Sequence, residues 1–227
     1  MLGVKIMKTK NKISIGITVL AICAIVLLLA VIVATGPTQG KKIEKYENPQ
    51  KALLIIDVQE DYTGSTAKPP FPYKDSGRLI TTVNNLIHEA NKKNVLVIYI
   101  KQEFDGILGR IFSKILAGGT AIKGNAGAEI DKRISIISNN SFSKPAGDAF
   151  SNPKLESFLI DHQVAELYIT GLDAEYCVYL TAKGALNRGY RVNIITDSIL
   201  LRAQKKWDKL LEKYRKDGIN LMSSHEL

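Results

Sequence analysis

The sequence predicts an α/β fold: a single three-layer, Rossmann-like domain with a mostly parallel sheet and helices on both faces. The first observation is that short apolar runs, such as Ala52–Ile56 and Val95–Ile100, alternate along the chain with segments of helical periodicity. The second is that these runs are continuously apolar, which is typical of parallel strands buried on both faces. With 227 residues, 45% of them hydrophobic and 23% charged, the chain has the composition of about one globular domain.

An uncharged apolar segment precedes this domain. Residues 1–12 form a basic tail, and residues 13–35 contain no charged side chain and are dominated by Ile, Val, Leu and Ala. About 23 helical residues span the ~30 Å hydrocarbon core of a bilayer, whereas a cleaved signal peptide has an apolar region of roughly 7–15 residues. We therefore predict a transmembrane anchor, or uncleaved signal, over residues 13–35.

The charges on either side of the segment predict its orientation. Lysines precede it, so the positive-inside rule predicts a cytoplasmic N-terminus and a single-pass protein whose catalytic domain is extracytoplasmic. Lys41, Lys42 and Lys45 follow the segment and weaken this bias. Residues 36–50, with two prolines and mixed charges, are predicted to be a linker, and residues 51–227 the domain.

Charge and cysteine content exclude several functional classes. Four of the 31 basic residues and none of the 22 acidic ones lie before residue 40, so the remainder carries a net charge of +5 with no dense basic cluster. This favours surface solvation over nucleic-acid binding. Cys23 lies in the apolar run, so we expect no disulfide with Cys177. Zinc-site spacings and glycine-rich phosphate loops are absent, so we predict no cofactor.

The first half of the domain contains two strands and a clear helix. After Ala52–Ile56, residues 61–75 are rich in Pro and Gly and are predicted to form a loop. Ser76–Lys93 has helical periodicity, with one apolar face: Leu79, Ile80, Val83, Leu86, Ile87 and Ala90. The second strand follows at Val95–Ile100. Residues 102–127 are harder to interpret: spaced isoleucines suggest a helix that Gly118 and Gly119 break, and we expect this stretch to form part of a pocket.

The second half repeats the alternation. Four strands are predicted, at Ile134–Ile137, Glu166–Thr170, Arg191–Thr196 and Ile219–Met222. Three helices are predicted, at Lys154–Asp161 after Asn152-Pro153, at Val178–Leu186 with Gly189 as a stop, and at Leu200–Lys216.

Two chemically reactive side chains follow predicted strands. Asp57 ends the first strand, and Cys177 follows the strand that precedes Gly171. In open parallel sheets, sites lie at the carboxyl ends of strands. We predict that Cys177 begins a helix, where unpaired N–H groups and the helix dipole would lower its pKa and make it a nucleophile. The alternative is a small, buried, inert residue.

A thiol nucleophile needs a base and a cation. His88, His162 and His225 lie within a helix, at a helix end and in the tail, and are predicted to be solvated. Asp57 is therefore the better base. A lysine near both groups would hold the carboxylate ionised and favour the thiolate. Lys101 and Lys144 both follow or end strands, and their spacing does not distinguish between them.

Three motifs carry a family resemblance. L-L-I-I-D-V-Q-E-D-Y runs from Leu53 to Tyr62, Lys144 precedes an Ala-Phe pair, and G-L-D-A-E-Y-C-V-Y-L-T-A begins at Gly171 and is followed by G-Y-R-V-N-I-I-T-D. In this order the chain resembles the isochorismatase-like superfamily of cysteine hydrolases, over about Ala52 to Asp197. The family includes nicotinamidases, N-carbamoyl amidases and isochorismatases.

The resemblance implies a catalytic triad. Cys177 would attack a carbonyl carbon and form a covalent thioester. Asp57 would take the thiol proton and pass it to the leaving group, and Lys144 would hold Asp57 and stabilise charge. The implied reaction is cleavage of an amide, imide or ureido C–N bond in a small-molecule substrate.

The resemblance also implies binding residues. A cis peptide is expected near Leu172-Asp173, and the N–H groups of Asp173 and Cys177 would form an oxyanion hole. Tyr62 and Phe150 match positions that line the family's pocket, and Tyr176 is a further candidate. For each aromatic residue the alternative is core packing. The Asp173 side chain would add polarity to the pocket or repel anionic substrates.

The chain departs from the family in three ways. Nicotinamidases carry a metal-binding Asp-x-His after an early strand, but here K-Q-E-F-D-G follows Ile100, and no histidine lies between His88 and His162. We therefore predict no zinc or iron site and no nicotinamidase activity. The apolar segment is unusual for cytosolic enzymes, and Asp173 replaces a residue that is often small.

Two other interpretations stay open: a membrane-tethered redox-thiol protein that uses Cys177, or a catalytically inactive binding protein on the same fold. Neither the substrate nor the oligomeric state is predicted, although relatives commonly form homo-oligomers.

Overall fold

The computed structural model describes residues 18–19, 21–22, 25, 36–69 and 71–227. The predicted tail, residues 1–12, and most of the predicted anchor therefore lie outside the described residues. Within the described part, no helix combines the length and the apolarity that crossing a membrane requires. The chain divides into two compact units, Met1–Gly36 and Pro37–Leu227, and the second contains the sheet with the helices that cover it.

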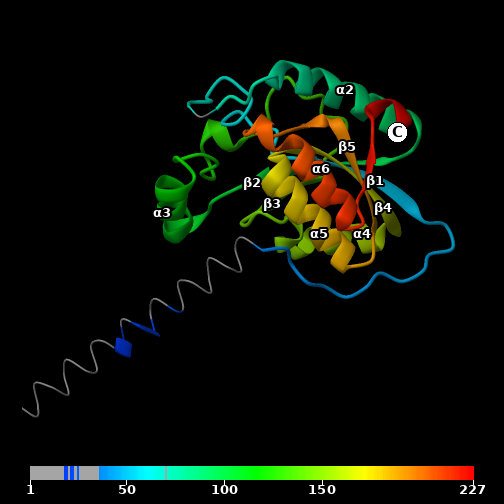
Figure 1. The fold of residues 1–227 in the computed structure, drawn as a ribbon, viewed down its shortest axis with the longest axis horizontal. Helices are drawn as coiled ribbons and strands as arrows, with labels where there is room; N and C mark the ends of the chain where they lie inside the picture. Colours follow the sequence, from blue (N-terminus) through cyan, green and yellow to red (C-terminus); the bar gives the residue numbers. More distant parts are fainter. Residues whose placement is uncertain (1–17, 20, 23–24, 26–35, 70) are drawn as a thin grey trace, which may run out of the picture. The chain divides into compact units, whose positions relative to one another are not determined.

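A six-stranded sheet forms the centre of the domain (Figure 1). Its strands are β1 (Gln50–Ile56), β2 (Leu96–Gln102), β3 (Ser141–Lys144), β4 (Val164–Leu172), β5 (Arg191–Leu200) and β6 (Asn220–Met222). They lie in the order β3-β2-β1-β4-β5-β6, and every pair is parallel. The predicted parallel sheet is confirmed, with β1 and β4 at its centre.

Helices cover both faces of the sheet (Figure 1). They are α2 (Ser76–Lys92), α4 (Pro153–Asp161), α5 (Tyr179–Asn187) and α6 (Trp207–Lys216), whereas α3 (Gly106–Leu116) lies to one side of the sheet (Figure 1). Leu53 and Ile55 of β1 pack in one apolar cluster with α2, whereas Leu54 and Ile56 pack in a second cluster with α4, α5 and α6. Successive residues of a strand point to opposite faces of the sheet. Because both faces are covered by helices, the residues on both faces must be apolar, which explains why the strand sequences are continuously apolar.

The predicted helix signals are largely confirmed. All six apolar residues predicted for the inner face of α2 are its buried residues. The Asn152 side chain accepts a hydrogen bond from Lys154 N at 3.0 Å and so caps α4. Gly189 follows α5 with φ of 86°, a left-handed conformation that suits glycine at a helix end.

The predicted third strand is wrong. Residues 134–137 form no strand, and β3 lies seven residues later, at Ser141–Lys144, beside β2. Tyr99 of β2 explains the difference: its hydroxyl donates to Ser135 O at 2.8 Å and accepts from Ile137 N at 3.0 Å. Residues 134–137 are thus held by hydrogen bonds to the Tyr99 side chain, whereas the more polar segment Ser141–Lys144 pairs with β2 in the sheet.

The predicted helix at Leu200–Lys216 begins too early. β5 continues to Leu200, and α6 begins at Trp207. After a register shift, Gly171 and Leu172 of β4 pair with Ile199 and Leu200. The sheet therefore extends beyond Thr196, where the predicted strand ends.

Residues 37–43, here named the N-terminal strap, are bound to the domain surface. Thr38 donates to Asp148 Oδ2 from its N–H at 2.8 Å and from its hydroxyl at 2.7 Å. Ile43 N donates to Arg188 O at 2.8 Å, just after α5. The first part of the segment predicted as a linker thus has fixed partners in the domain.

Candidate active site

The carboxyl ends of three strands bring together the three side chains predicted to carry the chemistry. Asp57 follows β1, Lys144 ends β3, and Cys177 lies in a π-helical turn, Ala174–Val178, that follows β4. Lys144 Nζ lies 2.9 Å from Asp57 Oδ2 and 3.2 Å from Cys177 Sγ. A carboxylate, an ammonium and a thiol therefore meet at one point.

The structure distinguishes between the two candidate lysines. Lys101 forms ion pairs with Glu103 at 3.1 Å and Glu129 at 3.0 Å, away from Cys177. Lys144 is only 1% exposed and contacts both reactive groups. Spacing could not show this, because the sheet order that places β3 next to β2 decides which lysine faces the site.

A buried amide pair that the sequence interpretation missed holds Lys144 in place. The ammonium donates to Gln102 Oε1 at 2.6 Å and to Ala146 O at 3.2 Å. Gln102 N donates to Gln59 Oε1 at 2.8 Å, and Gln59 Nε2 donates to Gln102 O at 3.0 Å and to Ala128 O at 2.7 Å. The one available signal was a polar residue, Gln102, at the end of an apolar strand.

The backbone at Asp57 turns away from the sheet. Its φ is 53°, a left-handed value that is uncommon for residues other than glycine, and its N–H donates to Ile100 O at 2.9 Å. Its Oδ2 faces Lys144, whereas Oδ1 is buried without a hydrogen-bond partner in the part of the chain described. Oδ1 is therefore free to accept a proton.

The turn after β4 positions Cys177. Gly171 has φ of 112°, and a Cβ there would collide with the Ile56 carbonyl, so β4 passes too close to β1 for any side chain. The predicted cis peptide at Leu172-Asp173 is confirmed. Asp173 caps the π-helical turn by accepting from Glu175 N at 2.8 Å. The helical segment thus begins three residues before Cys177.

Burial controls the ionisation of the three groups. It raises the pKa of the Cys177 thiol to about 12, with Lys144 opposing this and the Asp57 charge reinforcing it. The predicted lowering of this pKa is therefore wrong. Burial also raises the pKa of the Asp57 carboxyl, against the effect of Lys144. Burial alone would lower the pKa of Lys144, but the charges of Asp57 and Cys177 raise it. With a pKa of about 12, Cys177 is a thiol at neutral pH.

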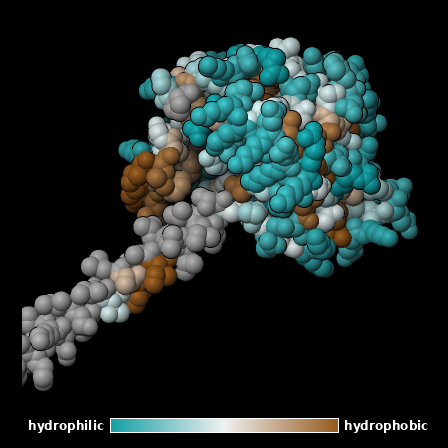
Figure 2. All heavy atoms as spheres, in the orientation of Figure 1, coloured by the Kyte–Doolittle hydropathy of each residue, from teal (hydrophilic) through white to brown (hydrophobic). Residues whose placement is uncertain are grey.

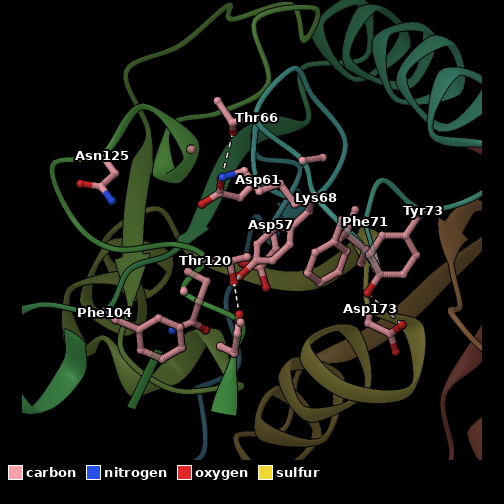
Figure 3. Close-up of a pocket in the computed structure, with 18 of the residues that line it drawn as sticks. Asp57, Asp61, Thr66, Lys68, Phe71, Tyr73, Phe104, Thr120, Asn125 and Asp173 are labelled. Carbon is pink, nitrogen blue, oxygen red and sulfur yellow. Dashed lines mark hydrogen bonds between the residues drawn. The ribbon is translucent and has the colours of Figure 1, made fainter. Parts of the chain in front are cut away.

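A pocket of about 800 Å³ opens above these groups and is lined by Asp57 and Cys177 (Figure 3). Tyr62, Phe71 and Tyr73 form one wall of the pocket. The ring centroid of Phe71 lies 5.0 Å from that of Tyr62 and 5.5 Å from that of Tyr73. Figure 3 shows Phe104 across the pocket from Phe71 and Tyr73. These walls explain how a deep polar floor is shielded from bulk water.

Two loops meet at the rim. Asp61 Oδ2 accepts from Ala121 N at 2.9 Å, and Oδ1 accepts from Thr66 Oγ1 at 2.9 Å (Figure 3). Residues 116–120, at the end of α3 and just after it, line the pocket. The expectation that residues 102–127 form part of the pocket is confirmed, although the sequence did not identify Asp61 as the residue that joins the loops.

The structure places three of the four predicted binding residues in the pocket lining: Tyr62, Asp173 and Tyr176. Two of the three hydrogen bonds that the Asp173 carboxyl accepts come from Tyr73 Oη and Arg202 N, both at 3.1 Å to Oδ2, so this side chain is engaged in holding the wall. Tyr176 is 51% exposed.

Phe150 does not line the pocket and is corrected to a core residue. It is 3% exposed, its ring lies 5.7 Å from that of Tyr190, and the Arg188 guanidinium lies 4.6 Å from its centroid. The reason is local: Ala149 N donates to Thr181 Oγ1 at 3.0 Å, which turns the segment beneath α5.

The side chains near the floor do not fit a zinc or iron site. Among the described residues, no three His, Cys, Asp or Glu side chains are grouped so that they could hold a metal ion. Both Asp61 oxygens accept hydrogen bonds from the protein. His88 lies in α2, His162 follows α4, and His225 lies in the C-terminal turn.

Comparison with known proteins gives a consistent result. A family model described as the Isochorismatase domain matches residues 51–226. A nicotinamidase of Escherichia coli is 26% identical over 184 residues, covering 66% of this chain and 82% of its own length. A streptothricin hydrolase of Streptomyces noursei is 28% identical over 150 residues, covering 66% of this chain. The match spans only 54% of the length of that hydrolase.

Solved structures share the fold. N-carbamoylsarcosine amidase from Thermoplasma acidophilum aligns with a TM-score of 0.65 and 23% identity, covering 78% of this chain and 98% of its own. A cysteine hydrolase from Pseudomonas syringae aligns with a TM-score of 0.69 and 15% identity, covering 83% and 96%. At these identities the similarity concerns the fold.

Proposed function

The chain belongs to the isochorismatase family and is a hydrolase, and on that premise we propose that it cleaves an amide, imide or ureido C–N bond of a small molecule through a thioester on Cys177. The observation that carries the proposal is that Lys144 Nζ lies within 3.2 Å of both Asp57 Oδ2 and Cys177 Sγ on the floor of the pocket. The relatives support this reaction class, since nicotinamidase and N-carbamoylsarcosine amidase are named for amide substrates.

In the first half-reaction, the Cys177 sulfur attacks the substrate carbonyl carbon while its proton moves to Asp57 Oδ1. The raised pKa values of thiol and carboxyl favour this coupling, because neither group holds a stable isolated charge in the buried floor. Proton transfer neutralises Asp57, and as the carbon–sulfur bond forms the negative charge passes to the carbonyl oxygen of the tetrahedral intermediate. The C–N bond breaks as the protonated Asp57 gives its proton to the leaving nitrogen.

In the second half-reaction, water attacks the thioester carbonyl. Asp57, again ionised, takes a proton from this water, and the carbon–sulfur bond breaks. The sulfur recovers its proton from Asp57, which is thereby ionised again, and the acid product leaves. Throughout both steps Lys144 remains an ammonium, consistent with its raised pKa. We further propose that the N–H groups of Asp173 and Cys177 stabilise the tetrahedral oxyanion; one such donor is typically worth ~3 kcal/mol of barrier.

The pocket supports a small substrate with a flat or apolar part. Its volume of about 800 Å³ lies within the usual range for small-molecule sites, about 300–1,000 Å³. Aromatic side chains on two sides, Phe71 and Phe104 among them, would contact a planar group. Tyr62 and Tyr176 are proposed as further substrate contacts, and Asp173 as a wall residue.

A redox-thiol function is less well supported. Reactive redox cysteines are thiolates with a lowered pKa in exposed, electropositive surroundings, whereas the pKa of Cys177 is raised. A catalytically inactive binding protein would not need a lysine that is 1% exposed in contact with both a carboxylate and a thiol. Both observations favour hydrolysis.

The test is a screen of small amides, carbamoyl compounds and lactams by ammonia release, run with wild type, Cys177→Ala and Asp57→Asn. We expect at least one class to be turned over by wild type only, with a thioester trapped by rapid quenching. Lys183→Ala, on α5 where the ammonium pairs with Asp217 at 3.5 Å, is the matched control and should retain activity. Peroxide-dependent oxidation of Cys177 without turnover of any amide would contradict the proposal.

The anchor is proposed on the sequence alone. Residues 13–35 would hold the domain at a membrane, with the domain outside the cytoplasm. Retention of the full chain in the membrane fraction at alkaline pH, and cleavage of the domain by protease added outside intact cells, would support it; release of the chain into the soluble fraction would contradict it.

A further inference from the structure

The outer side of α3 exposes large aliphatic side chains. Ile107 is 78% exposed, Leu108 82%, Ile111 48%, Ile115 73% and Leu116 65%; together they are named the α3 apolar face. Figure 2 shows them as a contiguous brown patch on an otherwise largely polar surface. Soluble monomers rarely expose such a cluster without a partner.

Helix geometry directs this face away from the domain. Ser113 is the one buried residue of α3, and its hydroxyl donates to Thr120 O at 2.6 Å. Phe112 packs against Phe104, with ring centroids 5.4 Å apart. At 3.6 residues per turn, Ile107, Ile111 and Ile115 lie on one side, roughly opposite Ser113. The inner contacts of the helix are therefore already satisfied.

The charges of α3 are all positive. Arg110 and Lys114 are exposed and lie one turn apart, beside the apolar face, and the helix contains no acidic residue. Asp105, which caps its N-terminus, forms an ion pair with Lys123 at 2.7 Å. An apolar helix face flanked by basic side chains is the pattern of helices that lie in the interface of anionic membranes, where long basic side chains reach the headgroups.

The predicted membrane anchor that precedes the domain also points to a lipid surface as the partner. The uncharged apolar run ends at Thr35, and Thr38 is already hydrogen-bonded to Asp148. Only Gly36 and Pro37 separate the two, so the end of a membrane-inserted run would lie within about 10 Å of Thr38 along the chain, at ~3.3–3.6 Å per residue. A surface held so close to lipid meets it at high effective concentration.

We propose that the α3 apolar face docks into an anionic lipid surface. A second copy of the chain fits less well, because two α3 helices face to face would bring Arg110 and Lys114 near their own copies. One helix of 11 residues is also small beside the roughly 800 Å² per partner of a stable interface. Anionic headgroups complement the same charges.

Docking would place the pocket rim at the membrane. Leu116 belongs to the α3 apolar face and also lines the pocket. Ala117 and Gly118, which follow it, line the pocket too. Substrates that partition into the headgroup region would then enter directly from the lipid surface. This inference concerns the surface and goes beyond the proposed chemistry, so it holds whether or not Cys177 is a nucleophile.

The experiment measures lipid contact residue by residue. The full chain carries Cys23→Ser and Cys177→Ala, so that one added cysteine takes a fluorescent probe: Ile111→Cys on α3, or Lys209→Cys on the exposed side of α6 as the matched control. Vesicles contain phosphatidylcholine and phosphatidylserine with a nitroxide-labelled lipid as quencher. We expect strong quenching at position 111, little at position 209, and a reduction at position 111 in Arg110→Gln/Lys114→Gln or at high salt.

Two outcomes would overturn the proposal. One is equal quenching, or none, at positions 111 and 209. The other is energy transfer between probes at position 111 of different molecules that persists without vesicles, which would assign the face to a second copy. Because the probe variants lack the thiol, neither outcome depends on hydrolase activity.

Discussion

The floor of the pocket and its rim are built in opposite ways. On the floor, Asp57, Lys144 and Gln102 are almost fully buried, and their polar groups are tied to one another and to the ends of three strands. At the rim, α3 turns its large aliphatic side chains to solvent and makes few inward contacts. The floor is complete within the domain, whereas the rim needs an external partner. Substitutions should therefore be costly at the floor and nearly silent at the rim.

The largest effect is expected at the sulfur. Cys177→Ala removes the nucleophile and should lower kcat/KM by at least about 10³-fold, since the hydrolytic route loses its covalent step. Cys177→Ser should be nearly as inactive, because a hydroxyl is a weaker nucleophile beside a carboxylate base. Ammonia release measures the effect, and an unchanged melting temperature is the control. Retention of more than a tenth of the activity in Cys177→Ala would remove the thioester from the mechanism.

Lys144→Met should be the most destabilising change on the floor. It leaves Asp57 buried without its cation, and breaking a buried pair from one side costs about 3–5 kcal/mol. The Asp57 pKa would rise further above its unfolded value, so the folded state would bind more protons than the unfolded one. Stability of the variant should therefore fall as pH rises through this range. Urea unfolding at several pH values measures it.

Lys101→Met is the matched control for that variant. Lys101 is also a strand lysine with two acidic partners, but its own side chain is 14% exposed and its partner Glu129 is 60% exposed. Its loss should cost at most about 1 kcal/mol, with activity retained. Equal destabilisation by the two substitutions would show that the floor has no special dependence on Lys144.

The pH profile should report the Asp57 carboxyl. Burial raises its pKa above the ordinary 3.8, so the acid limb of kcat/KM should lie at higher pH than for a solvated carboxyl, with activity falling about tenfold per pH unit below it. On the alkaline side the Cys177 thiol, with a pKa of about 12, and Lys144, with a raised pKa, should keep their protons through pH 9. An alkaline limb near pH 8 would instead indicate a thiol of ordinary pKa.

Gln102→Leu should have an intermediate effect. The amide accepts from the Lys144 ammonium at 2.6 Å, and a hydrogen bond to a buried charged group contributes about 1.5–3 kcal/mol. Without it the ammonium loses its alignment between carboxylate and thiol, so kcat should fall by about 10-fold or more while KM changes little. Gln204→Leu, at an exposed position before α6, is the control.

The sequence predicted the parts of the fold and of the site that depend on local patterns, and it failed for the parts that depend on tertiary packing. The strands, the buried face of α2 and the positions of Asp57 and Cys177 were predictable, because buried parallel strands and amphipathic helices leave patterns in the sequence itself. Lys144 was distinguished from Lys101 only by resemblance, since strand order is not written in spacing. The raised pKa of Cys177 depends on its burial, and the position of Phe150 depends on a turn beneath α5. The outward isoleucines of α3 gave a helical signal, but periodicity does not say which face is covered.

The smallest effect is expected on the α3 apolar face. Its size tests whether the rim, unlike the floor of the pocket, lacks packing partners within the domain. Leu108→Gln changes a side chain that is 82% exposed, so the free energy of unfolding in solution should change by less than about 0.5 kcal/mol. Leu86→Gln on α2, where the side chain is 1% exposed, should cost about 3 kcal/mol or more, since it buries an amide in the core. Calorimetry of the two variants measures the difference. A loss of 2 kcal/mol or more at Leu108, on the scale of core substitutions, would mean that the domain itself covers this face in solution and that no external partner is needed to explain it.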